Sequence, residues 1–285
     1  MKLSIIIPTV GRETLNAVLE GVLGSDNFED IDVEILIVFD GKGKDFFKKL
    51  VDSSSFTGNF GEVEIVFLET GERSYAGGAR NFGIEKSTGD VLVFIGDDTI
   101  PDKAWLQKVY DFHVDNLDEK VGLLGKISWV DRFAGDGFYK FLNSGPQFNF
   151  KQIEKKGADW HHFYTSNVSV KKSFVAEERF SDEFEGWGFE DTEFGYRLAK
   201  KGLKLAFDDS VQVYHDHEQS FDQVLENTRN MRKNALVFEK LHPEVSILPR
   251  GMKKLVLKVL VFLCAILPVG QRLKWWGRWK NVWIA

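Results

Sequence analysis

Two adjacent carboxylates, Asp97 and Asp98, follow the apolar run Val91–Ile95 and precede Pro101. Like charges so close together repel unless a cation or hydrogen-bond donors neutralise them. Carboxylate oxygens are ligands of Mg²⁺ and Mn²⁺, and such a cation can bridge a protein to a diphosphate. The pair therefore predicts a divalent-metal site at the end of a strand. The alternative is a solvated turn in which an aspartate caps the next helix.

A second acidic pair, Glu190 and Asp191, follows Trp187, which Gly186 and Gly188 flank. The glycines allow the backbone to bend closely, and an exposed indole can stack on a sugar ring. Both acids lie at the start of a predicted helix, where the helix dipole favours the ionised form. Asp191 is therefore a candidate general base for a hydroxyl group. The alternative is an ordinary acidic first helical turn.

Two further segments carry candidate ligands. His215 and His217 share one face of a predicted strand, so both could complete a metal site begun by an aspartate, although a surface pair is the alternative. In Tyr75–Gly83, small residues allow close approach and Arg80 could pair with a phosphate. That segment matches neither the Walker pattern nor G-x-G-x-x-G, so it is weak evidence for a phosphate loop.

The elements that must position these residues are short apolar runs separated by helix-like segments. The runs are Leu3–Ile7, Val33–Phe39, Val63–Leu68 and Val91–Ile95. Near-continuous hydrophobic strands joined by helical crossovers are typical of a parallel sheet that is covered on both faces. We therefore predict an α/β fold with a doubly wound, mostly parallel sheet flanked by helices. Ligands of such sheets bind beyond the carboxyl ends of the strands.

The second half of the chain is predicted to continue this pattern. A strand is expected over Val121–Val130, an irregular stretch over Ala134–Trp160, and two short strands over Leu203–Phe207 and Val211–Tyr214. The long amphipathic segment Phe221–Leu241 predicts a helix that ends before a proline.

Composition narrows the class of protein. The 285 residues are 43% hydrophobic and 28% charged, which excludes collagenous and largely disordered chains. Cys264 is the only cysteine, so no disulfide within the chain and no cysteine-based zinc or iron–sulfur site is expected. No secretory signal is predicted at Met1, and we expect a cytoplasmic protein.

The last part of the chain differs from the rest in charge. Residues 250–285 carry eight basic side chains and no acidic one, whereas the other 249 residues carry 29 basic and 43 acidic side chains. An acidic body is not expected to bind nucleic acid. The tail combines the apolar run Leu255–Leu267 with four tryptophans on one predicted helical face, Trp275, Trp276, Trp279 and Trp283. We expect this amphipathic tail to lie on an anionic membrane surface, the alternative being a hairpin packed on the protein.

Taken in order along the chain, these segments resemble a family 2 inverting glycosyltransferase of the GT-A fold. The resemblance covers residue 3 to about 240. It rests on the segments Ser4–Thr9 with Arg12, Ile37–Asp40, Ala79–Gly83 with Gly89-Asp90, Gly96–Asp98, Gly186–Asp191 and Tyr214-His215. One departure is Gly96, which stands where many members of the family carry a further acid.

The resemblance implies a role for each position. Pro8, Thr9 and Asp40 would hold the nucleobase, usually uracil, with Arg12 and Arg80 near the nucleotide and Asp97 on the ribose. Asp98 and His215 would hold Mn²⁺ or Mg²⁺. Asp191 would be the catalytic base, with Glu190 the substitute if Asp191 is only a helix-start acid. The acceptor would contact Trp187 and Gly188. Asn167 would position a sugar, although a strand hydrogen bond is an equal alternative for that residue.

The implied function is transfer of a sugar, with inversion, from a nucleotide-sugar to a hydroxyl of a glycan or lipid-linked acceptor, in surface polysaccharide assembly. Residues 1–249 would form the catalytic domain, with a nucleotide-binding half (1–115) and an acceptor-binding and catalytic half (116–249). Residues 250–285 would associate peripherally with the inner face of the cell membrane. The alternatives are a nucleotidyltransferase and a non-catalytic carbohydrate- or nucleotide-binding subunit.

Overall fold

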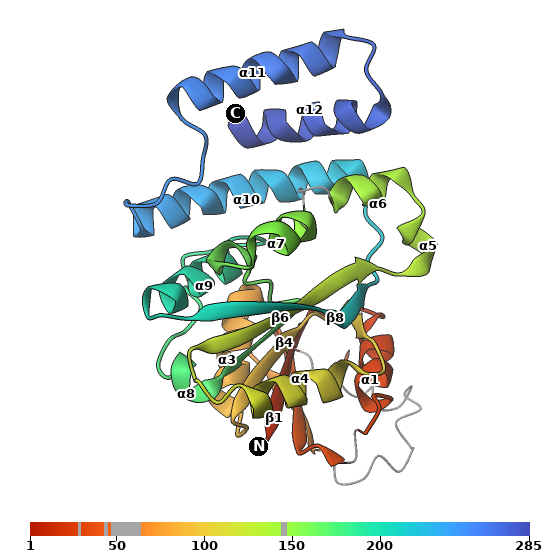
Figure 1. The fold of residues 1–285 in the computed structure, drawn as a ribbon, viewed down its shortest axis with the longest axis vertical. Coiled ribbons are helices and arrows are strands. Elements are labelled where there is room, and N and C mark those ends of the chain that lie inside the picture. The colour runs from red at the N-terminus through yellow and green to blue at the C-terminus, as the bar shows by residue number, and fades with distance from the viewer. Residues whose placement is uncertain (28–29, 43–44, 47–63, 144–146) are drawn as a thin grey trace.

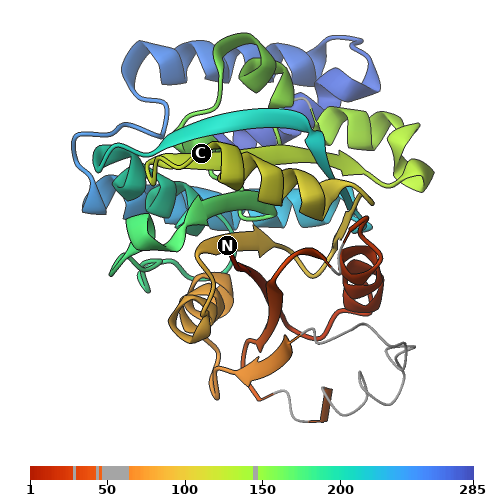
Figure 2. The same cartoon turned by 60° about the horizontal axis from the view of Figure 1, so that its bottom comes forward.

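The computed structural model describes residues 1–27, 30–42, 45–46, 64–143 and 147–285. Val63, with which the third strand was expected to begin, lies outside these residues. The described strands form one sheet in the order β3-β2-β1-β4-β7-β6-β8-β5, with helices on both faces (Figures 1 and 2). The predicted α/β architecture is confirmed.

The strands of the first half are all parallel to one another. They are β1 (Leu3–Thr9), β2 (Val33–Phe39), β3 (Glu64–Glu69) and β4 (Val91–Ile95). Across the sheet, β7 (Asn167–Lys171) is antiparallel to β4 and to β6 (Val121–Trp129). The long strand β8 (Lys204–His215) is parallel to β6, and the short β5 (Thr99–Pro101) pairs antiparallel with its end. The segment that follows β4 and the end of β8 therefore lie together.

The helices of the body follow in chain order. They are α1 (Leu15–Leu23), α3 (Tyr75–Lys86), α4 (Trp105–Asp115), α5 (Asp131–Ala134), α6 (Gly137–Leu142), α7 (Phe150–Lys156), the 3₁₀ turn η2 (Trp160–His162), α8 (Lys172–Val175), α9 (Glu190–Lys200) and α10 (Phe221–Leu241). Two more helices, α11 (Gly251–Ile266) and α12 (Gln271–Ile284), form the tail.

Alternation along β1 shows why the apolar runs are continuous. Ile5 and Ile7 pack in one buried cluster with α1 and α4, whereas Ile6 packs in the opposite cluster with α3, α8 and α9. Successive strand residues point to opposite faces, so a strand covered on both sides is apolar at nearly every position. The exception in β1 is Ser4, whose buried hydroxyl donates a hydrogen bond to Glu34 at 2.6 Å. Gly83 lets α3 approach the sheet, because a Cβ atom there would lie 2.6 Å from Ile6 Cγ2.

Two expectations about the second half need correction. The two short strands expected over residues 203–214 are one strand, β8, whose pairing with β6 shifts between Gly125 and Lys126. The polar residues Asp209 and Ser210 are exposed beside this irregularity, so they interrupt the apolar pattern without ending the strand. The stretch expected to be irregular holds the short helices α6 and α7, and α5 ends at its first residue.

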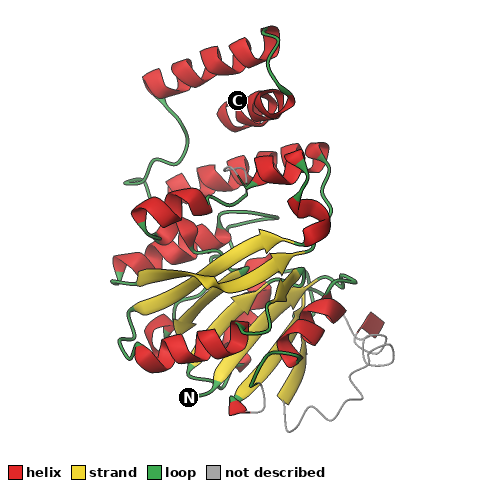
Figure 3. Cartoon of the chain, turned by 45° about the vertical axis from the view of Figure 1, so that its right-hand side comes forward, coloured by secondary structure: helices red, strands yellow, loops and turns green. Residues whose placement is uncertain are grey.

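The tryptophans of the tail lie against the protein. Trp275, Trp276 and Trp279 of α12 pack against a third cluster, which contains Trp129, Tyr139, Phe141, Leu142 and Val224. The expectation that this tryptophan face lies in a membrane is therefore wrong, because aromatic side chains of α6 and α10 cover it. The outermost layer is α11, which packs on α12 (Figure 3). Among the described helices, none is long and apolar enough to cross a membrane.

Candidate active site

A cleft of about 500 Å³ opens at the carboxyl ends of β1, β2 and β4. Almost all the predicted site residues line it, although they come from six separate segments of the chain. Those lining the cleft are Pro8, Thr9, Arg12, Asp40, Arg80, Asp97, Asp98, Trp187, Gly188, Glu190, Asp191 and His215. The fold thus brings the two acidic pairs of the sequence to one cavity.

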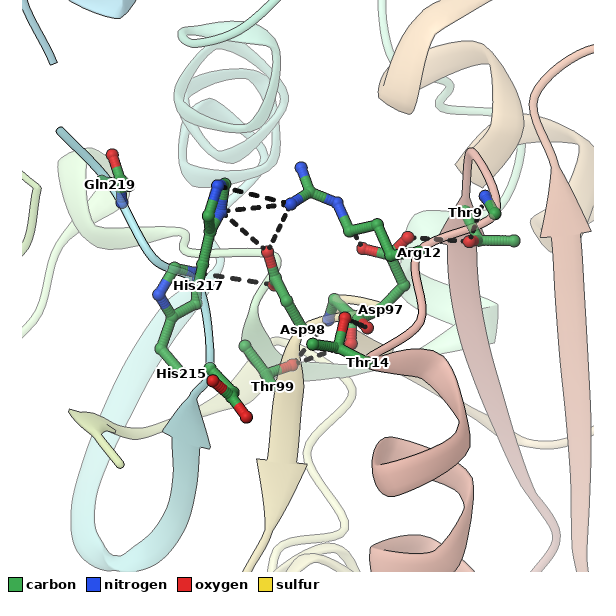
Figure 4. A network of polar contacts seen from close by, with 12 residues as sticks. Thr9, Arg12, Thr14, Asp97, Asp98, Thr99, His215, His217 and Gln219 are labelled. Atoms are coloured by element: carbon green, nitrogen blue, oxygen red, sulfur yellow. Dashed lines mark hydrogen bonds and ion pairs between the residues drawn. The ribbon is translucent and has the colours of Figure 1, made fainter. Parts of the chain in front are cut away.

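The strongest polar cluster of the cleft surrounds Asp98 (Figure 4). His215 Nε2 lies 3.4 Å from Asp98 Oδ1, and His217 Nδ1 lies 3.3 Å from Asp98 Oδ2. Burial by itself would raise the pKa of Asp98, but His215, His217 and Arg12 outweigh burial and hold the pKa well below its usual range. Asp98 is therefore an ionised carboxylate that faces two imidazoles. A carboxylate must be ionised to bind a metal ion.

Pairing of β5 with β8 creates this cluster. Thr99, directly after Asp98, pairs with His215 across the two strands, and the Asp216 backbone N–H donates to Asp98 O at 2.7 Å. The two histidines alternate on the extended chain, so both rings reach the same carboxylate. His217, to which the resemblance assigns no role, lies as close to Asp98 as His215 does.

Three side-chain atoms, one each from Asp98, His215 and His217, lie within 4.8 Å of one another, which suits a shared divalent cation. The donor set of one carboxylate and two imidazoles fits the group that the resemblance implies. Imidazole is a better ligand for Mn²⁺ than for Mg²⁺, which prefers oxygen atoms, so the two histidines favour Mn²⁺.

Asp97 faces the first strand instead. Thr9 Oγ1 donates to Asp97 Oδ2 at 2.7 Å, and Arg12 Nε lies 3.3 Å from Asp97 Oδ1. Burial and the charge of Asp98 raise the pKa of Asp97 to about 6, against the opposing effect of Arg12. Arg12 also lies 3.5 Å from Asp98 and 3.2 Å from His217, so one guanidinium spans both halves of the pair.

Asp40, at the end of β2, is fixed by the segment that leads into α3. Its Oδ1 atom accepts hydrogen bonds from the backbone N–H of Ser74 at 2.6 Å and from the Ser74 hydroxyl at 3.1 Å. Arg73 lies 3.7 Å from its other oxygen. Asp40 is largely buried yet lines the cleft, which suits a group that recognises a planar ligand at the sheet edge.

The second acidic pair is divided between two roles. Glu190 is buried, lies 3.3 Å from Arg80 Nη1 and accepts a hydrogen bond from the Gly188 backbone N–H at 3.0 Å. Asp191 is half-buried and accepts a hydrogen bond from the Thr192 backbone N–H at 2.7 Å. Burial, and then the charge of Glu190, raise the pKa of Asp191 to about 7. Both acids line the cleft, but Glu190 is paired with Arg80 and the Gly188 backbone, whereas Asp191 has the raised pKa that suits a general base.

Two helices hold the loop that carries this pair. Asn234 of α10 donates from its side-chain amide to the backbone oxygens of Glu185 and Gly188, at 3.0 and 2.8 Å. Gly188 has φ +98°, and a Cβ atom there would lie 2.7 Å from Met231, also of α10. The ring of Phe189 stacks parallel to Trp283 of α12, with centroids 6.1 Å apart. The backbone before Asp191 is therefore constrained from the side of the tail.

Asn167 is not in the cleft. Its amide nitrogen donates to the backbone oxygens of Lys126 and Val211, and its oxygen accepts from Trp105 Nε1 at 2.9 Å. A role in binding the acceptor or the donor sugar is therefore wrong, because the side chain is engaged in joining β7 to β6, β8 and α4. The strand hydrogen bond is the alternative that holds.

Several residues that line the cleft were not predicted from the sequence. They are Arg73, Tyr75, Gln147, Gln219, Asn227, Asn230 and Met231. The three on α10 belong to none of the motifs, and the packing of α10 over the loop brings them to the cleft. For Tyr75 one signal was present, since it follows Ser74 at the start of a glycine-rich segment.

The amino-acid sequence matches a known protein family over more than half of its length. Residues 4–177 match the model of glycosyl transferase family 2. The chain belongs to that family.

Characterised relatives carry sugar-transfer names. Validoxylamine A glucosyltransferase of Streptomyces hygroscopicus subsp. limoneus is 26% identical over 87% of this chain, and glucosyl-dolichyl phosphate glucuronosyltransferase of Haloferax volcanii is 26% identical over 84%. Chondroitin synthase of Escherichia coli is 23% identical over 82%. The chain spans 58%, 70% and 37% of the length of these relatives, respectively.

Solved structures share the fold. S. aureus TarS 1-349 in complex with UDP-GlcNAc aligns over 83% of this chain and 67% of its own, with a TM-score of 0.58 and 16% identity. The same protein in complex with UDP aligns over all of this chain and 89% of its own, with a TM-score of 0.57 and 15% identity. The GT-A architecture predicted from the sequence is confirmed.

Proposed function

We propose that this chain is a metal-dependent inverting glycosyltransferase that moves a sugar from a UDP-sugar to a hydroxyl of a glycan or lipid-linked acceptor. The observation that carries the proposal is that the cluster of Asp98, His215 and His217 and the candidate base Asp191 line the same cleft. Family membership and the names of the relatives support sugar transfer. The structural neighbours solved with UDP and UDP-GlcNAc support a UDP-sugar as the donor.

The nucleotide would occupy the edge of the sheet built by residues 1–115. Pro8, Thr9 and Asp40 would receive the uracil, while Arg12 and Arg80 would lie near the nucleotide and Asp97 beside the ribose. Arg80 already pairs with Glu190, so it would act mainly by holding that carboxylate and by adding positive charge to the floor of the cleft. Asp98, His215 and His217 would hold Mn²⁺ or Mg²⁺, which when bound neutralises charge on the leaving diphosphate.

The acceptor would enter the side built by residues 116–249. Trp187, which is 43% exposed at the cleft, offers its face for stacking on a sugar, and Gly188 leaves room beside it. Asp191 would accept the proton of the acceptor hydroxyl as its oxygen attacks the anomeric carbon. The bond from that carbon to the diphosphate oxygen breaks on the opposite face, and its electron pair leaves with the diphosphate, so the centre inverts.

A panel of nucleotide-sugars tests this function. With Mn²⁺ present, a UDP-sugar should raise the melting temperature and be hydrolysed slowly to UDP, whereas the Asp191→Asn variant should show the same thermal shift without hydrolysis. If no nucleotide-sugar stabilises the protein, the proposal fails. If stabilisation requires a nucleoside triphosphate and pyrophosphate is released, the protein is a nucleotidyltransferase.

We also propose that residues 250–285 attach the enzyme peripherally to the inner, cytoplasmic face of a cell membrane, where a lipid-linked acceptor in surface polysaccharide assembly would be found. The charge of the tail supports this placement, because eight basic side chains without an acidic one favour an anionic leaflet. The division into a catalytic body, 1–249, and this tail is part of the proposal.

A further inference from the structure

The tail forms two layers on the body. Helix α12 packs on α10 and α6, and α11 packs on α12 (Figures 1 and 3). At the contact between the two helices, Gly277 leaves so little space that a Cβ atom there would lie 2.9 Å from Cys264 Cβ. Leu257, Val261 and Cys264 of α11 are half-buried on this inner side. The tail is therefore a hairpin whose inner helix is integrated with the body.

The opposite side of α11 is apolar and exposed. Residues recurring at spacings of three and four lie on one face of a helix, and the outer face carries no polar residue at those positions. Six of its large side chains are between 50% and 73% exposed, namely Met252, Leu255, Val256, Val259, Phe262 and Ile266, and Leu263 between them is 37% exposed. A contiguous apolar face of this kind marks a surface that another apolar phase covers.

The basic residues around α11 indicate what kind of apolar phase covers its outer face. Lys253 and Lys258 are exposed on the flanks of α11, whereas Lys254 is half-buried and lies on the inner side, one helical turn before Leu257. Arg272 and Lys274 add positive charge at the turn into α12. Two copies of this chain meeting through α11 would bring these like charges together, whereas an anionic leaflet neutralises them.

We propose that the outer face of α11 is the lipid-contacting surface and that the helix lies in the plane of an anionic leaflet. The inference rests on the membrane placement within the proposed function and deepens it: α11 enters the acyl boundary, while the tryptophans of α12 stay in the protein. Over sixteen residues α11 spans ~24 Å, so its whole outer face can lie flat at the interface. The catalytic body then lies beneath a surface-bound helix to which α12 joins it.

Sedimentation with vesicles of phosphatidylglycerol and phosphatidylcholine tests the surface. The full chain should sediment with these vesicles and less with pure phosphatidylcholine. The double variant Val259→Glu/Phe262→Glu should lower the partition coefficient at least about tenfold, with an unchanged melting temperature because both side chains are exposed. The matched control Val114→Glu/Leu117→Glu adds the same charge at exposed apolar positions near the end of α4 and should bind vesicles as the unaltered chain does.

A second readout separates α11 from the tryptophans. Brominated phosphatidylcholine mixed into the vesicles should leave the native tryptophan emission nearly unchanged, whereas a Phe262→Trp variant should gain a quenched component. Strong quenching of the native emission, or sedimentation of the double variant equal to that of the unaltered chain, overturns the inference. So does a dimer in light scattering that the double variant abolishes, since a second copy is then the occupant. UDP binding by the double variant, measured in parallel, shows separately whether the proposed catalytic function holds.

Discussion

At the scale of single residues, the two acidic pairs gain distinct roles from their surroundings. Asp98 keeps its charge because imidazoles and a guanidinium face it, whereas Asp97 and Asp191 gain proton affinity from burial and from a neighbouring acid. Glu190 is occupied by Arg80 and by the Gly188 backbone, which leaves Asp191 as the candidate base. Residue type predicted the pairs, but the partners decide which member stays ionised and which gains proton affinity, and the proposed roles rest on that difference.

The Asp191→Asn variant tests the base. Asparagine keeps the size and the hydrogen bond from Thr192 but cannot accept a proton, so turnover of the UDP-sugar should fall by ~10²-fold or more. Affinity for UDP with Mn²⁺ should stay the same. Transfer or hydrolysis near the unaltered rate would instead move the role to Glu190, which the Glu190→Gln variant then tests.

The pH profile of turnover tests the environment of the same carboxylate. Asp191 acts only when deprotonated, and burial beside Glu190 raises its pKa to about 7, against the opposing charge of Arg80. The logarithm of kcat should therefore rise with a slope near one up to pH about 7 and then level off. A profile that is flat from pH 5 to pH 8 would show that no such carboxylate limits the reaction.

At the scale of elements, strands and helices with strong periodicity were predictable, and their relative placement was not. Helix Phe221–Leu241 and strand Val91–Ile95 have the expected bounds, because amphipathic spacing and unbroken apolar runs are local signals. The contribution of α10 to the cleft, by contrast, depends on how Asn234 and Met231 pack over the loop that leads to Asp191. The tryptophan face of α12 was visible as a pattern, but its partner is an aromatic cluster from α6 and α10 that no local spacing reveals.

Trp283 tests whether α12 positions the catalytic loop. Its ring stacks on Phe189, two residues before Asp191, so the Trp283→Ala variant should lower kcat roughly tenfold by loosening the loop, a cost of ~1.4 kcal/mol in the barrier. Affinity for UDP should change little, because the residues proposed for UDP lie elsewhere. The conservative Trp283→Phe variant keeps a stacking ring and should restore most of the turnover. Equal turnover of all three proteins would mean that the stacking is only a packing contact.

At the scale of the whole molecule, the cleft lies between the sheet edge proposed to bind the nucleotide and a helical layer that continues into the tail. Because α12 covers the aromatic cluster on α6 and α10, the body and the tail share apolar surface. The tail is therefore not a separable unit, and its removal should affect the stability of the body. The sequence showed the change of composition near residue 250, but composition does not tell whether a basic, tryptophan-rich helix faces lipid or protein.

A chain ending at Pro249 should therefore be destabilised. Removing α12 exposes the side chains that Trp275, Trp276 and Trp279 cover, and a buried large apolar side chain contributes ~1.5–3 kcal/mol. The melting temperature should fall by more than about 10 °C for a chain of this size. The Val259→Glu/Phe262→Glu variant serves as the control with an intact α12. An unchanged melting temperature in the truncated chain would show that the tail is a separate unit.

Calorimetric titration of UDP, with and without Mn²⁺, decides whether the cleft is a metal-dependent nucleotide-sugar site. With Mn²⁺ present, UDP should bind both the unaltered chain and the Asp191→Asn variant. Without the metal, or in an Asp98→Ala variant with an unchanged circular dichroism spectrum, affinity should fall at least about tenfold, as loss of a charged contact implies. UDP affinity that is equal in the unaltered chain with and without Mn²⁺ and in Asp98→Ala would contradict the proposal, as would the absence of UDP binding under every condition.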